Sequence, residues 1–144
     1  IRGDVPRKII DQLAKRMRVS KHQAGRLIMT ESAFVSSQSQ KDCYKELGVE
    51  QFEFVATLDN KTSEICRQMD GKVFKMADYQ IGVNAPPLHC FCRSCTVPYF
   101  EDDFGQSGKR AARGADGKTT YVGGDITYEE WKKKYVKDTT PAEE

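Results

Sequence analysis

The first third of the chain places hydrophobic residues at intervals of three and four, the period of an amphipathic helix. The residues that share this face are Val5, Ile9, Ile10, Leu13 and Met17. They predict a helix over about 5–17, with Asp4 as its N-cap. Ser20 is a second N-cap candidate, and apolar residues continue at helical spacing to Leu47, where Gly48 is a typical left-handed C-cap. The segment therefore predicts two helices joined by a short turn.

The period of the pattern changes to two after residue 50. Phe52, Phe54 and Ala56 alternate with other residues, as in a strand with one buried face. Two further short strands are predicted, one near 72–74 after an Asp-Gly turn and one over 95–100, whose proline suits a sheet edge. Helices followed by a small, mainly antiparallel sheet make an α+β fold.

The last part of the chain, 101–144, has glycines separated mostly by polar residues. We expect much of 101–124 to be a flexible arm whose deletion, together with the rest of this part, leaves the core folded. A short helix over about 127–136 has acids in its first turn and lysines in its last, as the helix dipole prefers. Trp131 and Tyr135 share one of its faces and are interpreted as an anchor, onto this domain or onto a partner.

The chain thus divides into a helical segment at 1–48, an α+β core at 49–100 and the loose C-terminal arm. Its 144 residues suffice for one compact domain with some additional chain. The formal net charge of +2 does not indicate a strongly basic nucleic-acid-binding protein. However, the first 47 residues hold ten of the 23 Lys/Arg and only five of the 21 Asp/Glu. Only the helical segment is therefore basic.

No apolar run approaches the roughly 20 residues that cross a bilayer, and no secretory signal pattern is present, so we expect no membrane contact. The chain begins at Ile1 rather than methionine, and we expect it to be a segment of a longer protein. Its five cysteines are too few for a disulfide scaffold and odd in number, which favours a reducing compartment.

Residues 57–99 contain several ordered sequence blocks. These are Thr57-Leu-Asp59-Asn-Lys-Thr62-Ser63-Glu64-Ile-Cys66-Arg67, Met69-Asp70-Gly71-Lys-Val-Phe74, Gly82-Val-Asn84-Ala-Pro86-Pro87-Leu-His89, Cys92-Arg93-Ser94 and Val97-Pro98-Tyr99. They resemble the signature of the Mu F-like phage head-morphogenesis family. The resemblance implies a minor capsid protein, located in the phage head or, during assembly, in the host cytoplasm. It implies the portal protein or other head proteins as partners.

The same resemblance marks the motif residues, to which we assign structural roles. They are Asp59, Thr62, Ser63, Cys66, Asp70, Gly71, Pro86, Pro87, His89, Cys92, Arg93 and Ser94. Many family members have Cys-x-x-Cys early and Cys-Arg-Cys late, whereas this chain has Met69 and Ser94 at the second positions. It is similar to the branch with a Cys-Arg-Ser late motif. A complete zinc quartet is not carried over, and we expect no bound metal and no other cofactor.

Several interpretations of the cysteines stay open. Cys66, His89, Cys92 and Cys95 are ligands of the kind that hold structural zinc, although the close spacing of the last three disfavours a tetrahedral site. We favour Cys66 and Cys92 as buried, small apolar residues that join two loops; a disulfide between them is the third interpretation. A catalytic Cys92–His89 pair is disfavoured, because residues three apart in a loop seldom have the required geometry.

Asp59, Thr62 and Ser63 form a dense polar group after the first strand. A phosphate contact is conceivable there, but local hydrogen bonds that form a turn and cap the following segment are favoured. Arg93 is expected to pair with Asp59 or Asp70, with no bound anion required.

Two functions outside capsid assembly compete. Mu F-like domains resemble ADP-ribosyltransferases in fold, and Arg93-Ser94-Cys95-Thr96 with Glu129 or Glu130 could be assigned the roles of that enzyme. Those acids, however, lie in a predicted helix, whose first turn they stabilise. Residues 9–28 have the spacing of a helix-turn-helix DNA-binding motif, but the second helix is too long for a recognition helix.

We therefore expect a non-enzymatic α+β protein that acts in head assembly by binding other head proteins. Four basic residues of the helical segment are candidates for non-specific contacts with the phosphates of packaged DNA. They are Arg16, Arg18, Lys21 and Arg26.

Overall fold

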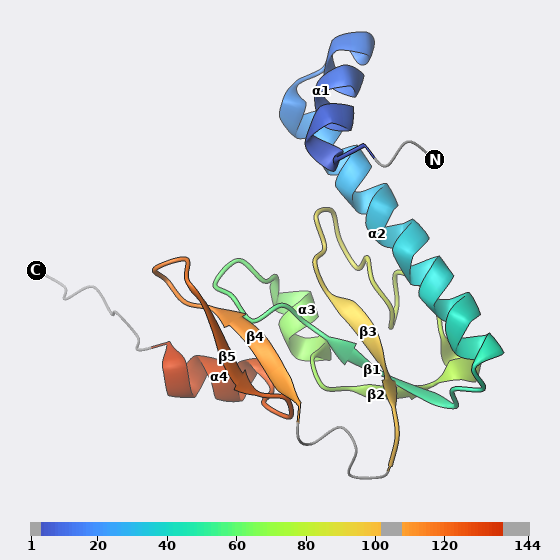
Figure 1. Ribbon diagram of the computed structural model, residues 1–144, viewed down its shortest axis with the longest axis vertical. Coiled ribbons are helices and arrows are strands. Elements are labelled where there is room, and N and C mark those ends of the chain that lie inside the picture. The colour runs from blue at the N-terminus through green and yellow to red at the C-terminus, as the bar shows by residue number, and fades with distance from the viewer. Residues whose placement is uncertain (1–3, 102–107, 137–144) are drawn as a thin grey trace, which may run out of the picture.

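The computed structural model describes residues 4–101 and 108–136 (Figure 1). Two N-terminal helices are followed by a three-stranded antiparallel sheet, a separate two-stranded hairpin and a short C-terminal helix. The α+β class expected from the sequence is confirmed.

The first helix, α1 (Pro6–Met17), begins with a proline. Since an N–H in the first turn has no acceptor within the helix, a proline there costs no helical hydrogen bond. Its N-cap is Val5 and not the expected Asp4, whose carboxylate lies 2.8 Å from the ammonium of Lys8. The helix ends at Arg18, which adopts a left-handed conformation with φ of 55°.

The second helix, α2 (Lys21–Glu46), has Ser20 as its N-cap, as the sequence predicted, and the structure adds a capping box. The Gln23 N–H donates to the Ser20 hydroxyl at 3.1 Å, and the Gln23 side chain accepts from the Ser20 N–H at 3.0 Å. The N-terminal half of α2 packs against α1, and this hairpin projects from the rest of the molecule (Figure 1).

The C-terminal half of α2 lies against the three-stranded sheet. The Tyr44 hydroxyl donates to the backbone carbonyl of Thr96 at 2.9 Å, and the Tyr79 hydroxyl donates to that of Ser37 at 3.2 Å. Both hydroxyls are buried, so these bonds satisfy polar groups that would otherwise be costly inside the core. They fix the position of the long helix on the sheet.

The sheet has β1 (Gln51–Val55) at its centre, antiparallel to β2 (Val73–Lys75) on one side and β3 (Cys95–Tyr99) on the other. The predicted buried face is confirmed, because Phe52 and Phe54 are completely buried and Ala56 is 2% exposed. Pro98 lies in β3, an edge strand, where its lack of an N–H is tolerated.

Two short helices connect these strands. The first, α3 (Glu64–Met69), follows β1, and the 3-10 helix η1 (Met76–Asp78) follows β2. A long loop then leads from η1 to β3 and contains a cis peptide bond between Pro86 and Pro87. This loop carries His89 and Cys92 past α3, which carries Cys66.

The described part of the predicted flexible arm is ordered. Residues 109–113 form β4 (Lys109–Arg113), which pairs in antiparallel fashion with β5 (Thr119–Gly123). The expectation of a flexible arm over 101–124 is therefore wrong for 108–124, while 102–107 lies outside the described residues. The Arg113 N–H donates to the Leu58 carbonyl at 2.8 Å and so joins the hairpin to the chain that leaves β1.

The last helix, α4 (Tyr128–Tyr135), agrees with its prediction and has a capping box between Thr127 and Glu130. It packs on the β4–β5 hairpin and on Leu58 through a small hydrophobic cluster. The buried members of this cluster are Leu58, Ala112, Val122, Tyr128 and Trp131. The C-terminal part is thus held to the body by a core of its own.

Candidate functional site

Three potential metal ligands meet where α3 faces the loop before β3. The Sγ of Cys66 lies 3.2 Å from the Nε2 of His89 and 3.7 Å from the Sγ of Cys92. All three donor atoms lie within 4.8 Å of one another, and both cysteines are buried. The sequence interpretation that these two cysteines join two loops is therefore consistent with the structure.

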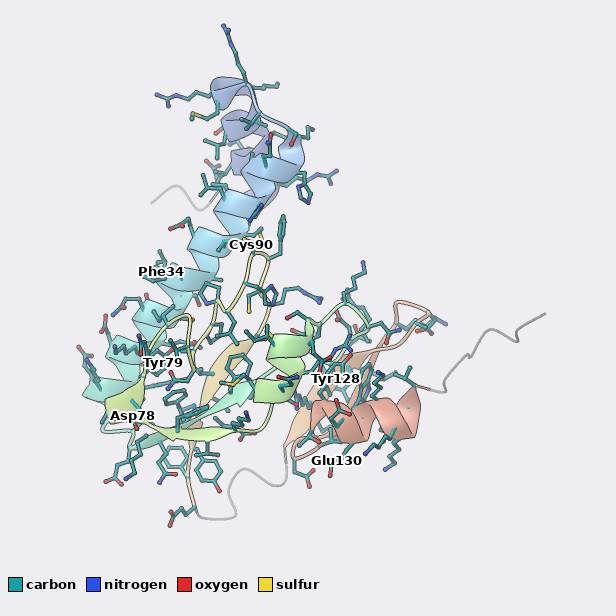
Figure 2. All side chains as sticks on the ribbon, turned by 180° about the vertical axis from the view of Figure 1, so that it is seen from behind. Phe34, Asp78, Tyr79, Cys90, Tyr128 and Glu130 are labelled. Atoms are coloured by element: carbon teal, nitrogen blue, oxygen red, sulfur yellow. The ribbon has the colours of Figure 1, made fainter. Side chains whose placement is uncertain are left out.

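The orientation of His89 is fixed by its own loop. Its Nδ1 lies 2.7 Å from the carbonyl oxygen of Cys90, a contact that only an Nδ1–H donor can make. In the neutral ring the Nε2 then carries the lone pair, which accepts from the Cys66 thiol when that thiol does not donate to Cys92, or can bind a metal ion. Cys90 itself lies beside α2, where its sulfur accepts from the Nε of Arg26 at 3.0 Å (Figure 2).

The two buried thiols have different acidities. The hydrogen bond between them lowers the pKa of Cys92 against the opposing effect of burial. The same hydrogen bond, together with burial, raises the pKa of Cys66. A sulfur–sulfur distance of 3.7 Å exceeds the roughly 2.05 Å of a disulfide, so both cysteines are free thiols in this structure.

The donor set is one ligand short of a closed structural zinc site, which has four nitrogen or sulfur ligands. Cys95, considered as the fourth ligand from the sequence, does not belong to the group. The Ser63 hydroxyl is buried without a hydrogen-bond partner among the described residues and lines the same cavity as Cys66 and His89. A hydroxyl is not one of the usual zinc ligands. The residues present therefore fit three corners of a tetrahedral site.

The cavity beside this cluster has a volume of about 20 Å³. That is room for one water molecule or ion, whereas small-molecule substrates occupy pockets of roughly 300–1,000 Å³. The hydrogen bond of the His89 ring is with Cys66, whereas Cys92 bonds His89 through the backbone, so the side-chain pair considered from the sequence as catalytic is not the one that is hydrogen-bonded. The site has the geometry of a structural contact between α3 and the loop before β3.

Asp59 and Arg93 form an ion pair, which is one of the two pairings of Arg93 that the sequence left open. The guanidinium contacts both carboxylate oxygens, one of them at 2.9 Å. Asp59 also accepts from the Lys61 N–H at 2.9 Å and the Thr62 hydroxyl at 3.0 Å. Burial alone would raise the pKa of Asp59, but these hydrogen bonds, that from Arg93 foremost, lower it to about 2. The favoured local-turn interpretation is confirmed for Asp59 and Thr62, whereas Ser63 is the N-cap of α3 without a side-chain cap.

Asp70 is the centre of a second, deeper network. Its carboxylate pairs with the Arg110 guanidinium at 2.6 and 3.0 Å and accepts from the N–H groups of Ala56 and Tyr128, both at 2.7 Å. Arg110 also donates to the carbonyls of Ala56 and Ile126. The Asp70 and Arg110 side chains are only 1% and 11% exposed. The sequence prediction did not include Arg110. The one local indication was that Arg110 lies in a short stretch in which residue types alternate, as in a strand.

The other motif residues shape the backbone around these networks. Gly71 has φ of 75°, a left-handed conformation that favours glycine in the turn before β2. Pro86 is fully buried, and Pro87 follows it through the cis bond. Ser94 lines the small cavity together with Ser63.

The four predicted DNA-contact residues differ in their surroundings. Arg16 and Arg18 lie exposed at the free end of the α1–α2 hairpin. Lys21 pairs with Asp11 at 2.7 Å, and Arg26 is directed to Cys90. The structure thus leaves Arg16 and Arg18 as the better candidates.

The proposed partner anchor on α4 needs a correction. Trp131 is 2% exposed, because it packs with Tyr128 at a ring-centroid distance of 5.4 Å in the protein's own core. It anchors α4 onto this domain, the other alternative raised from the sequence, and is not available to a partner. Tyr135 is 51% exposed.

Glu130, one of the two acids considered for an ADP-ribosyltransferase site, has a structural role. Glu130 closes the capping box of α4 by accepting from the Thr127 N–H at 2.9 Å (Figure 2). Arg93, the corresponding arginine, is occupied by Asp59. These contacts favour the first-turn explanation given by the sequence.

A family model described as phage Mu protein F-like protein matches residues 1–97. The chain belongs to this family. No curated protein and no solved structure gives a significant match. The part that matches the phage Mu protein F-like family contains the α1–α2 hairpin, most of the three-stranded sheet and the cluster of Cys66, His89 and Cys92, whereas β4, β5 and α4 follow it.

Membership of the phage Mu protein F-like family indicates a minor capsid protein with a role in phage head morphogenesis. It also points to a protein that is not an enzyme. Among the described helices, none has both the length and the apolar character of a membrane span.

Proposed function

We propose that this protein acts in head morphogenesis by binding the portal protein or a neighbouring head protein through its α1–α2 hairpin. The supporting observation is that the hairpin projects from the body and exposes apolar side chains that two helices alone cannot bury (Figure 1). The exposed residues are Val5, Met17, Val19, Leu27, Met29, Phe34 and Val35, between 39% and 64% exposed. Exposed apolar surface of this kind on a projecting element favours protein contact.

The basic charge of the hairpin supports a partner with an acidic surface. Arg16 and Arg18 flank Met17 at the free end, and only five acids accompany the ten basic residues of the first 47. A complementary surface on a head protein would be apolar at its centre and acidic at its rim. Leu27 and Phe34 are seven residues apart on α2, hence on one face, and Phe34 lies on the side of α2 away from Cys90 (Figure 2).

The experiment is a binding assay with the purified portal and head proteins encoded beside this protein. The double variant Leu27→Gln/Phe34→Gln should lose binding, whereas Leu47→Gln should retain it, because Leu47 is 72% exposed but lies beyond the hairpin. Circular dichroism checks that both variants are folded. Equal binding by the two variants, or no binding of any head protein by the unmodified chain, would refute the proposal.

Contact with packaged DNA is a secondary part of the proposed function, supported by the exposed arginines at the free end. Such contacts would involve phosphates only, so binding should be equal for unrelated duplexes and steeply dependent on salt. Arg16→Ala and Arg18→Ala should each reduce the slope of log K against log salt by about one unit. A strong preference for one duplex sequence would instead favour the helix-turn-helix alternative. The protein would act in the virion head or in the host cytoplasm during assembly.

A further inference from the structure

The β4–β5 hairpin has one face that no other described residue covers. Antiparallel pairing places Arg110, Ala112 and Val122 on the inner face, and all three contribute to the buried contacts with α4 or Asp70. The outer face, on the opposite side of the pleat, consists of Lys109, Ala111, Arg113, Thr119, Tyr121 and Gly123. Each of these six residues is exposed, and all lie beyond the part that matches the family model.

Tyr121 is the centre of this outer face and is 70% exposed. Its direct partner across the hairpin is Ala111, and its neighbours two positions away on its own strand are Thr119 and Gly123. None of these small side chains can cover a phenol ring. Lysine and arginine lie at the two diagonal positions of the opposite strand, which are within reach of long side chains in a sheet.

The outer face carries two positive charges. Lys109 and Arg113 are its cations, and none of its six residues is acidic. Two acids lie near its ends: Asp116, in the connecting turn, accepts from the Lys118 N–H at 3.0 Å, and the Asp125 carboxylate lies beside Gly123, at the end of the face that holds Lys109. The face therefore presents an open aromatic ring between two positive charges.

We propose that the outer face of β4–β5 binds single-stranded nucleic acid, with Tyr121 stacked on a base and Lys109 and Arg113 on the adjoining phosphates. A single strand offers flat unstacked bases and regularly spaced anions together, which is the combination that this face complements. A duplex keeps its base faces stacked internally and would use only the cations. An acidic protein surface would likewise leave the ring without a matching flat partner.

The test uses the full chain and a fluorescently labelled thymidine oligonucleotide, with binding followed by anisotropy. Tyr121→Ser should weaken binding about tenfold, because one base loses its stacking partner. Tyr121→Phe keeps the ring and should bind like the unmodified chain. The matched control is Tyr135→Ser, which removes an exposed tyrosine from α4 and should have no effect.

Salt dependence tests the two cations. The double variant Lys109→Gln/Arg113→Gln should lower the slope of log K against log salt by about 1.4, since each phosphate contact on a single strand contributes about 0.7. Lys132→Gln/Lys133→Gln removes the same charge from α4 and should leave the slope closer to its original value.

Three results would overturn the inference: the same affinity for Tyr121→Ser and Tyr135→Ser, competition by duplex DNA as strong as by the single strand, or equally strong competition by polyglutamate. Because the α1–α2 hairpin is unchanged in these variants, binding to head proteins should persist in all of them. Failure of this inference is thereby distinguishable from failure of the proposed function.

Discussion

Replacement of Arg110 by alanine should destabilise the protein more than any change on the exposed face of the same strand. The guanidinium donates to both oxygens of Asp70 and to the carbonyls of Ala56 and Ile126. Its removal leaves the Asp70 carboxylate, only 1% exposed, with two backbone N–H donors and no counter-charge. Two carbonyls lose a donor at the same time.

The magnitude follows from the burial of the pair. Breaking a buried ion pair by removing one partner costs about 3–5 kcal/mol, because the remaining charge is uncompensated. Since domains of this size have a total stability of about 5–15 kcal/mol, the variant would lose a large share of it. The melting temperature should fall by about 10–20 °C.

Urea unfolding followed by tryptophan fluorescence measures this loss directly, because the sole tryptophan, Trp131, lies in the cluster beside Arg110. The matched control is Arg113→Ala, which removes an exposed arginine three positions along β4 and should cost less than about 1 kcal/mol. In the double variant Asp70→Asn/Arg110→Ala the loss should be smaller than the sum of the two single losses. A cost for Arg110→Ala similar to that of Arg113→Ala would refute the reasoning.

Three further predictions concern other parts of the molecule. Deleting 101–144 should destabilise or unfold the remaining chain, contrary to the sequence expectation, because it uncovers Leu58 and removes Arg110; circular dichroism showing an unchanged melting temperature would contradict this. Because the pKa of Asp59 is lowered from its usual 3.8 to about 2, its ion pair stabilises the protein above about pH 4, and that contribution is lost as the pH falls toward 2. Asp59→Asn should therefore cost about 1–2 kcal/mol of unfolding free energy at pH 7, because solvent screens the half-exposed Arg93. The variant should also lose less stability than the unmodified chain between pH 4 and 2, and an unchanged acid-unfolding profile would count against this prediction. With three ligands gathered and the fourth missing, the purified protein should contain no stoichiometric zinc and chelation should leave its melting temperature unchanged, whereas elemental analysis showing one zinc per chain would disprove this.

The helices were predictable because their signals are local. Ser20 and Thr127 each satisfy backbone donors three residues further along the chain, so the capping boxes depend on neighbours in sequence. The same holds for the alternation of Phe52 and Phe54 in β1. Hydrophobic periodicity and capping residues are sufficient to predict such elements, whatever they pack against in the fold.

The motif residues could be recognised from the sequence, but their partners could not all be assigned. A pair between Arg93 and either Asp59 or Asp70 was anticipated because all three belong to the motif, and the structure pairs Arg93 with Asp59. Arg110 lies 40 positions from Asp70, in a segment whose many glycines indicated a loose arm. Nothing in the local pattern shows which of several arginines will neutralise a buried carboxylate.

By itself, then, the sequence determined the α+β class, the positions of the helices and the central strand, and the family to which the chain belongs. Only the tertiary structure decided that β4–β5 and α4 are parts of the folded body, that Trp131 is internal, and that His89 meets Cys66. The physical reason is that these features are contacts between distant segments. The short strand Lys-Arg-Ala-Ala-Arg is too polar to predict a core element. It becomes one because Leu58 and Tyr128 give its inner face apolar contacts and Asp70 gives it an ion pair.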